Sequence, residues 1–360
     1  MNEQHNLRYF LGGNTSQGFY SLYDSFVSQE DGDFLWIIKG GPGCGKSSFM
    51  KKIGAAAESA GLNVEYVSCS SDPDSLDGVF IPALNIAYMD GTAPHIADAN
   101  IAAADSSYID LGAFYNNDAI AGQREELGTL SQSIFAMYKR AYAILAAAGS
   151  FLGSWQNSFV NESERQAANR RIQGIAAREF GKRRDAKERE GFVKRRFLSA
   201  VTCKGIVAFP ETARILCERF YLLDNRLCLG EAALTQAADA AVSAGYDVFL
   251  CPNPLIPDVP EAVLIPELSL GFIVSTSALS VIRHDRRIRL DALVSSERMR
   301  AMRHEIRRCE KISEAALENA VTALSEAKSL HEKKEKMYNP HVDFKGVYAL
   351  AEKHILALGL

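Results

Sequence analysis

Eight consecutive residues, Gly40-Gly41-Pro42-Gly43-Cys44-Gly45-Lys46-Ser47, satisfy the pattern GxxxxGK[ST]. Glycines let such a loop turn its amide N–H groups toward phosphate oxygens, and the N-terminus of a following helix adds positive potential. The lysine of this pattern reaches the β- and γ-phosphates, and the Ser47 hydroxyl would ligate Mg²⁺. These residues, with Ser48 behind them, therefore predict a site for Mg²⁺ and a nucleoside triphosphate, ATP or GTP.

An acidic residue follows this loop in the sequence, at a separation that suits a second metal ligand. Asp90 ends the apolar stretch NIAYMD, 44 residues after Lys46. An aspartate at the end of such a strand helps to hold Mg²⁺ in P-loop NTPases, so we assign Ser47 and Asp90 as the metal ligands. The next residue is Gly91 rather than a glutamate that could act as catalytic base, which predicts slow hydrolysis.

The acidic loop CSSDPDSLDG (residues 69–78) offers candidates for that missing base, Asp72, Asp74 and Asp77. It follows an expected strand, and in open α/β sheets the carboxyl ends of the strands face the ligand. Helix-cap and turn roles are the alternative for all three. In the internal repeat described below, Asp74 recurs as Asp258 whereas Asp72 is replaced by Ile256. We therefore expect Asp72 to act with Lys46 and Asp90 in catalysis, and Asp74 to be structural.

Three further residues near the site could take part. Thr92 and His95, in GTAPH (91–95), could contact the γ-phosphate, although Thr92 recurs as Thr276, which favours a structural role. Cys44 lies at the expected start of a helix, where a thiolate is favoured. We therefore expect alkylating agents to block nucleotide binding and ATP to protect the thiol.

Strands and helices that could position these residues alternate along the chain. The apolar run FLWIIK (34–39) precedes the glycine loop, a helix is expected at about 45–60, and strands are expected at 63–68 and 85–90. Strands that alternate with helices, with no hairpin signal between them, predict a mostly parallel sheet with helices on both faces. Residues 118–190 and 296–338 are rich in helix formers and predict long helical excursions.

The chain aligns on itself at an offset of 184 residues. Twelve of the 36 positions from Ala57 to Thr92 are identical to their counterparts, where about 7% identity is expected by chance. Residues 10–26 likewise match residues 197–213. We therefore expect two tandem P-loop NTPase-like α/β domains joined near residue 190. Residues 1–190 would form the nucleotide-binding domain, with a helical insert at about 110–190, and residues 191–360 a second domain with C-terminal helices.

The second copy has lost the chemistry of the first. In the ungapped register Lys46 corresponds to Gly230, Ser47 to Glu231 and Asp90 to Val274. A glutamate at the helix start would repel phosphate. The apolar strand positions are kept, so the second domain is expected to be an inactive partner of the first.

The segments FLGGNTSQGFYSLYDS, KGGPGCGKSSFMKKIG, CSSDPDSLDGVFIPALNIAYMDGTAPH and VDFKGVYALAEKHILALGL resemble a bacterial family of tandem P-loop ATPase-like proteins. The resemblance covers nearly the whole chain and implies binding of ATP or GTP. That family usually carries a P-loop in both halves, and this sequence departs from the pattern in the second half.

Composition gives no overall reason to expect a polyanionic partner, because the formal net charge is −4. Seven cysteines without a CxxC pair, and no secretory signal pattern, lead us to expect a cytoplasmic protein with reduced thiols. No apolar stretch has the length of a membrane span. Two regions, 162–196 and 282–291, are basic. They could be solvated faces of helices and loops, or a surface that binds anions or nucleic acid. Alternatively, one of them could supply an arginine to the ATP phosphates. Sparse aromatic residues there make nucleic-acid binding the less expected of these.

Together these patterns predict a slow Mg²⁺-dependent ATPase or nucleotide switch with one functional site. One alternative is a kinase that phosphorylates a small molecule or nucleotide, with the helical insert as an acceptor lid. The other is a non-enzymatic, nucleotide-gated scaffold that binds a protein partner, whose identity the sequence leaves open.

Overall fold

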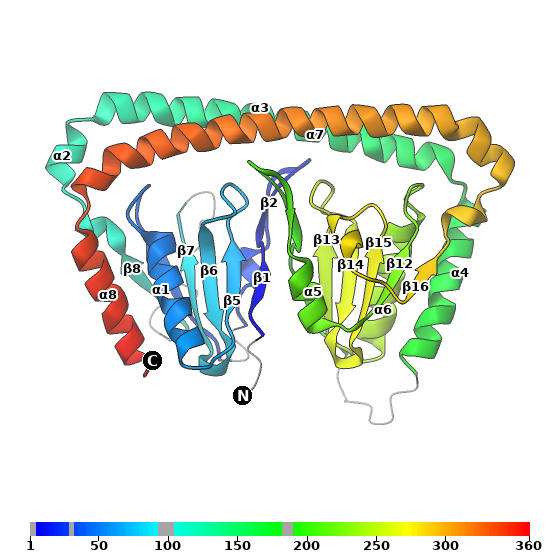
Figure 1. Ribbon diagram of the computed structural model, residues 1–360, viewed down its shortest axis with the longest axis horizontal. Helices are drawn as coiled ribbons and strands as arrows, with labels where there is room; N and C mark the ends of the chain where they lie inside the picture. The colour runs from blue at the N-terminus through cyan, green and yellow to red at the C-terminus, as the bar shows by residue number, and fades with distance from the viewer. Residues whose placement is uncertain (1–4, 29–31, 93–103, 182–189) are drawn as a thin grey trace.

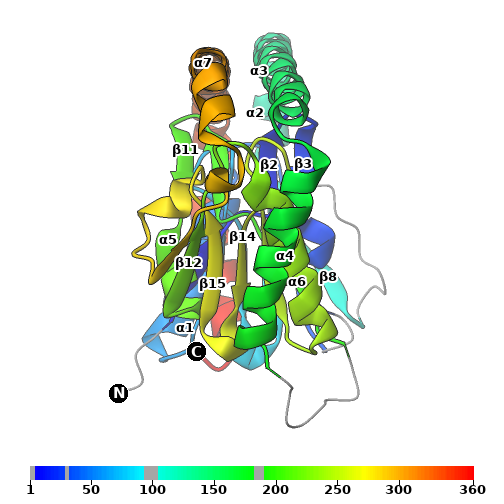
Figure 2. The same cartoon turned by 90° about the vertical axis from the view of Figure 1, so that its right-hand side faces the viewer.

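The computed structural model describes residues 5–28, 32–92, 104–181 and 190–360, with the side chains of 153–157 excepted. Two α/β units lie side by side beneath a pair of long helices that spans both of them (Figure 1). The end-on view shows these two helices next to each other at one end of the molecule (Figure 2). In the described part of the chain, no helix combines the length and apolar character needed to cross a membrane.

The first unit contains a six-stranded sheet and a separate β-hairpin. Its elements are β1 (Leu7–Tyr9), β2 (Gly12–Thr15), β3 (Gly18–Ser21), β4 (Phe34–Lys39), α1 (Lys46–Ser59), β5 (Glu65–Ser68), β6 (Leu76–Ile81), β7 (Ile86–Asp90) and β8 (Ser106–Asp110). Three helices then follow: α2 (Asn117–Ala121), α3 (Arg124–Phe159) and α4 (Glu162–Glu179).

The second unit repeats this arrangement. Its elements are β9 (Val193–Arg195), β10 (Ser199–Thr202), β11 (Gly205–Ala208), α5 (Pro210–Leu216), β12 (Arg219–Leu223), α6 (Leu229–Ser243), β13 (Val248–Pro252), β14 (Pro260–Ile265), β15 (Leu270–Val274) and β16 (Arg286–Ile288). The chain ends with α7 (Ser296–Tyr338) and α8 (Phe344–Ala357).

The two sheets have the same strand order, as the internal repeat predicts. The first runs β1-β5-β6-β7-β4-β8, and the second runs β9-β13-β14-β15-β12-β16. Both sheets are mixed, because β6 and β14 are antiparallel to both of their neighbours. The other five strands of each sheet run in one direction, so the expectation of a mostly parallel sheet is confirmed, apart from the one reversed strand in each. Sequence analysis overlooked β6, whose sequence LDGVFI begins inside the acidic loop and contains a glycine.

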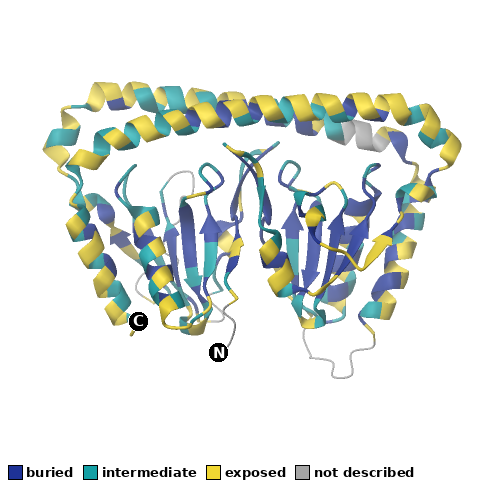
Figure 3. Ribbon diagram, in the orientation of Figure 1, coloured by how far each residue is buried: buried dark blue, intermediate teal, exposed yellow. Residues whose placement is uncertain are grey.

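The two units share one hydrophobic core where they meet. Phe10 and Phe197, which occupy equivalent positions in the repeat, form an antiparallel bridge with N–O distances of 2.8 and 3.0 Å. Both rings are fully buried in a cluster that takes residues from both units. The pairing of equivalent residues places an approximate two-fold axis between the units, and most strands of both sheets are buried (Figure 3).

The helices that end the two halves are exchanged between the units. Helix α3 (36 residues) carries the chain from the first unit to the second, where Ile172 and Ile175 of α4 pack in the core that contains α6. Helix α7 (43 residues) carries it back, and Val347 and Ala351 of α8 pack against α1. The helix at 162–179, which belongs to the first half of the sequence, therefore completes the second unit.

The long helices contact each other through small residues. Ala141 and Leu145 of α3 are buried with Ala320 and Ala323 of α7. Alanines allow two helices to approach closely, so the pair forms a continuous antiparallel bar. The β2–β3 hairpin supports this bar, since Tyr142 of α3 donates a hydrogen bond to the Asn14 side chain at 3.0 Å.

Candidate functional site

The glycine loop (residues 40–47) connects buried strand β4 to helix α1, as predicted. Gly40, Gly43 and Gly45 have φ angles of 154°, 71° and 92°, which a residue with a side chain rarely adopts. A Cβ atom at Gly40 would lie 2.5 Å from Cys44 Sγ. Glycine is therefore required for the conformation of the loop and for the packing inside it.

Lys46 lies at the centre of this site, and its ammonium group contacts the backbone of the loop itself. Its Nζ donates hydrogen bonds to the carbonyl oxygens of Gly40 at 2.7 Å and Gly41 at 3.0 Å. It also lies 3.7 Å from Oδ2 of Asp90, and both side chains are largely buried, at 13% and 14% exposure. Lys46 and Asp90 therefore lie close together, as the sequence predicts.

Asp90 and Ser47 are held by their own neighbours. Thr92 donates both its backbone N–H, at 2.9 Å, and its hydroxyl, at 2.5 Å, to Asp90 Oδ1. The Ser47 hydroxyl accepts the backbone N–H of Leu76 at 2.9 Å, which ties α1 to the start of β6. Thr92 therefore orients the Asp90 carboxylate, in keeping with the structural role inferred from its repetition. Ser48 follows Ser47 in the first turn of α1, and His95 lies outside the described residues.

Asp72 lies on the acidic loop at the same edge of the sheet, and its carboxylate is engaged by helix α7. Lys328 Nζ lies 2.7 Å from Asp72 Oδ2, and the Ser75 hydroxyl donates to the same carboxylate at 3.0 Å. Burial acts to raise the pKa of Asp72, but the hydrogen bond and charge of Lys328 outweigh it and hold the pKa below its usual value. An ion-paired carboxylate is a weak base, so action as a general base requires the separation of Lys328 from Asp72.

The other two acids of this loop have clear structural contacts. Asp74 accepts Lys204, at the tip of the β10–β11 hairpin, at 2.5 Å. The equivalent pair on the other side of the two-fold axis is Gln17 and Asp258, which are also hydrogen-bonded. Asp77 is buried and accepts the Tyr23 hydroxyl at 2.8 Å. The structural role inferred for Asp74 is thus a contact between the two halves.

Residues remote in sequence cover the glycine loop, and sequence analysis did not identify them. The Tyr115 hydroxyl donates to the Pro42 carbonyl at 2.8 Å. In the amide orientation that satisfies both neighbours, Asn339 Nδ2 donates to the carbonyl oxygens of Gly43, at 3.2 Å, and of Glu335, at 3.1 Å. Glu335 and Asn339 lie almost 300 residues after the loop, at the end of α7, so no local spacing could have indicated them.

Cys44 differs from its predicted behaviour. The side chain is only 1% exposed. Burial raises the pKa of its thiol, and the nearby Lys46 offsets this only in part. The expectation of a reactive thiolate at this helix start is therefore wrong, because the loss of water outweighs the helix field.

The degenerate loop (residues 224–231) connects β12 to α6 as the glycine loop connects β4 to α1, but Cys228 (φ 57°) is its one residue with positive φ, and side chains fill it. Asn225 is 1% exposed, and its Oδ1 accepts the Gly230 N–H at 2.9 Å. Its Nδ2 donates to Glu231 at 3.1 Å and to the Thr276 hydroxyl at 2.9 Å. The Asn225 amide oxygen therefore accepts the Gly230 N–H, a group that in an unfilled loop could donate to a phosphate oxygen.

Helix α7 contacts this second loop as well as the first. Arg226 forms a two-point ion pair with Glu310, at 2.9 and 3.1 Å. Glu310 and Asn339 are separated by about 40 Å at 1.5 Å per residue. One helix is thus bonded to the glycine loop near its end and to the degenerate loop near its start.

Comparison of the chain with models of protein families, with curated proteins and with solved structures found no match. Function is therefore inferred from the geometry of the site.

Proposed function

We propose that the chain binds one Mg²⁺–nucleoside triphosphate at the glycine loop and acts as a slow ATPase or nucleotide switch. The observation that carries this proposal is the position of Lys46, 3.7 Å from Asp90, at the mouth of a loop with three left-handed glycines. Such a loop supplies backbone N–H donors and the helix N-terminus, while the lysine supplies the charge that triphosphate binding requires.

The residues at the site fit Mg²⁺ in the presence of a triphosphate. Ser47 and Asp90 offer two oxygen ligands, and Mg²⁺ commonly takes its other ligands from phosphates and water. No group of three His, Cys, Asp or Glu side chains gathers as a metal site within the described ranges. The metal would therefore bind together with the nucleotide, and it would neutralise charge on the phosphates.

The contacts of α7 favour a switch within this proposal. A bound triphosphate brings negative charge to a site where Asp72 and Glu335 already lie near Lys328. The phosphates and Asp72 would compete for the charge of Lys328, so binding would alter how α7 sits on the site. Glu310 of the same helix is ion-paired to Arg226 of the degenerate loop. A movement of α7 on nucleotide binding would therefore reach the second unit.

Calorimetric titration of the full chain with ATP and Mg²⁺ tests the proposal. We expect Lys46→Ala to weaken Mg²⁺-dependent binding at least about 100-fold, since it removes the charged donor to the phosphates. Lys353→Ala, on the exposed face of α8, is the matched control and should bind as the unaltered chain does. Binding that survives Lys46→Ala and is lost on changing residues 228–231 would contradict a single site in the first unit.

Phosphate release distinguishes the three activities considered. Slow release with ATP and Mg²⁺ alone supports the ATPase, and release that requires an added pool of acceptor metabolites supports the kinase. Tight binding without turnover supports the nucleotide-gated scaffold.

A further inference from the structure

The two basic regions of the sequence come together at one cavity in the second unit. This cavity, of about 410 Å³, lies between α4 and the edge strand β16. Its lining includes five arginines, Arg170, Arg171, Arg178, Arg286 and Arg287. We refer to it as the arginine groove. Its two walls are more than a hundred residues apart in the sequence.

The arginines on the α4 wall of the groove are regularly spaced along the helix. Arg170, Gly174 and Arg178 are spaced four residues apart on α4, so they share one face of the helix over about 12 Å. A Cβ atom at Gly174 would have no neighbour within 4 Å, so this position leaves space between the two arginines. Arg286 lies on the opposite wall, and buried Tyr221 and Ile288 form part of the lining between them.

Among the described residues, Arg287 alone of the five arginines has a carboxylate within 4 Å. Arg287 pairs with Asp224 at 2.7 Å, whereas Arg171 donates only to the backbone carbonyl of Arg289, at 3.3 Å. In the part of the chain that the structure describes, no carboxylate lies within 4 Å of Arg170, Arg178 or Arg286. Glu179 of α4 accepts the Tyr221 hydroxyl at 2.5 Å and pairs with Arg219 at 3.1 Å, and these contacts, together with the charge of Arg286, lower its pKa.

The first unit provides an internal comparison. Strand β8 pairs with β4 as β16 pairs with β12. Because Ile38 and Leu223 occupy the same place against β7 and β15, Ser107 and Tyr108 lie in the places of Arg286 and Arg287. The arginines are therefore not a requirement of the shared fold. They occur in the unit whose own phosphate-binding loop is filled by Asn225.

We propose that the arginine groove binds a small ligand that carries two or more adjacent phosphate groups. Guanidinium groups pair with phosphate oxygens in a two-point geometry, and several of them facing one space suit a multiply charged anion. The volume is that of a site for a small molecule, and the apolar lining can contact the part of the ligand that bears the phosphates. This site is separate from the glycine loop and does not depend on nucleotide binding there.

A nucleic acid is a poorer match to the groove. About 12 Å of arginines covers few backbone phosphates, and the lining offers only one aromatic ring, whose hydroxyl is already hydrogen-bonded to Glu179.

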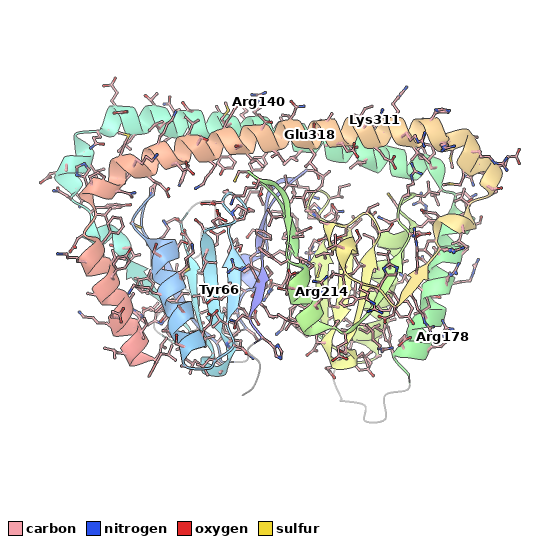
Figure 4. All side chains as sticks on the ribbon, in the orientation of Figure 1. Tyr66, Arg140, Arg178, Arg214, Lys311 and Glu318 are labelled. Atoms are coloured by element: carbon pink, nitrogen blue, oxygen red, sulfur yellow. The ribbon has the colours of Figure 1, made fainter. Side chains whose placement is uncertain are left out.

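The test uses the full chain with Lys46→Ala, so that the glycine loop does not contribute. Titration with inorganic tripolyphosphate at low salt should show one site, at least about tenfold tighter than orthophosphate. Arg170→Gln with Arg178→Gln, and separately Arg286→Gln, should each weaken binding at least about tenfold. Arg214→Gln is the control: it also lies in the second unit, but on α5, away from Arg178 of α4 (Figure 4). Thermal melting of each variant verifies folding, and exposed arginines are not required for the core.

Two results would overturn the proposal. The first is tripolyphosphate binding that is absent, or unchanged in the groove variants relative to Arg214→Gln. The second is a single-stranded oligonucleotide that binds at the same arginines more tightly than tripolyphosphate at equal salt. Titration with ATP in the same Lys46→Ala background distinguishes a nucleotide from a simple polyphosphate, because only the nucleotide can gain from the apolar lining.

Discussion

At the scale of single residues, the two loops show how few substitutions separate the proposed phosphate site from a loop that is filled by side chains. In the first loop the charge of Lys46 is balanced by Asp90 and by the carbonyl oxygens of Gly40 and Gly41, in a largely buried position. In the second, Asn225 and Glu231 form a buried pair, and both polar atoms of the Asn225 amide are hydrogen-bonded to protein atoms. Asn225 accepts a hydrogen bond from the backbone N–H of Gly230. Its side chain therefore lies where a phosphate oxygen would bind in an unfilled loop.

The buried Glu231 should make stability depend on pH. Burial raises its pKa from 4.5 to about 7. As pH rises from about 4.5 to 7, the unfolded chain releases this proton while the folded chain keeps it, so the free energy of unfolding falls by about 3 kcal/mol. Glu231→Gln retains an acceptor for Asn225 without the titration, and its loss of stability over this range should be smaller by that amount.

Denaturant unfolding at pH 5 and pH 8 measures this difference. Glu314→Gln, which removes an exposed charge on α7, is the control and should follow the unaltered chain. Equal pH dependence in the Glu231→Gln variant and the unaltered chain would show that Glu231 is ionised in the folded protein at neutral pH.

At the scale of elements, the contact between α7 and the acidic loop is the one that joins a predicted site residue to a distant helix. The Lys328–Asp72 ion pair is partly buried, with 22% and 18% of the side chains exposed. A double-mutant cycle of Lys328→Met and Asp72→Asn should therefore give a coupling of about 1 kcal/mol in the free energy of unfolding. Lys333→Met, on an exposed position of the same helix, should show no coupling to Asp72→Asn.

The same variants separate binding from turnover. If Asp72 activates water, Asp72→Asn should lower phosphate release at least about tenfold without weakening ATP binding. Equal turnover in Asp72→Asn and the unaltered chain would show that Asp72 does not activate water and that its role is the ion pair with α7.

The elements that sequence reasoning could predict are those with local signals. The strand, glycine loop and helix from Phe34 to Ser59 follow from an apolar run, a glycine pattern and helix formers in direct succession. Strand β6 could not be predicted in this way, because it begins within a polar loop and its partners are chosen by the sheet. Likewise, the apolar face of α4 shows that the helix must be covered, but not which sheet or helix covers it.

The site was predictable to the same extent. Lys46, Ser47 and Asp90 belong to patterns whose spacing reflects adjacent strands. Lys328, Glu335 and Asn339 belong to no pattern, since their role depends on where a 43-residue helix ends in space. The burial of Cys44 could not be seen either, because it depends on the packing of Leu111 and Gly40 around the thiol.

At the scale of the whole molecule, the exchanged helices predict that neither half folds alone. A chain of residues 1–190 lacks α8, so the face of α1 that contacts Val347 and Ala351 is exposed, and the apolar side chains of α4 have no unit to cover. Each buried aliphatic side chain that loses its cover costs about 1.5–3 kcal/mol. We expect residues 1–190 and residues 191–360 to be insoluble or partly unfolded when expressed separately, and to form a folded complex when expressed together.

Circular dichroism and gel filtration measure this outcome. A 1–190 chain with residues 340–360 appended through a flexible linker is the informative comparison, since it restores α8 to the first unit. Cooperative unfolding of residues 1–190 alone would show that α8 is dispensable, contrary to its packing against α1.

The helix exchange also bears on how such a chain could arise. A half-length ancestor with the same terminal helix could have buried it only on a second copy of itself, as an intertwined homodimer around the axis between Phe10 and Phe197. Fusion of the two genes would have made that partnership permanent. From then on the two halves no longer had to share one sequence, so side chains could fill the loop of the second half while its sheet was kept.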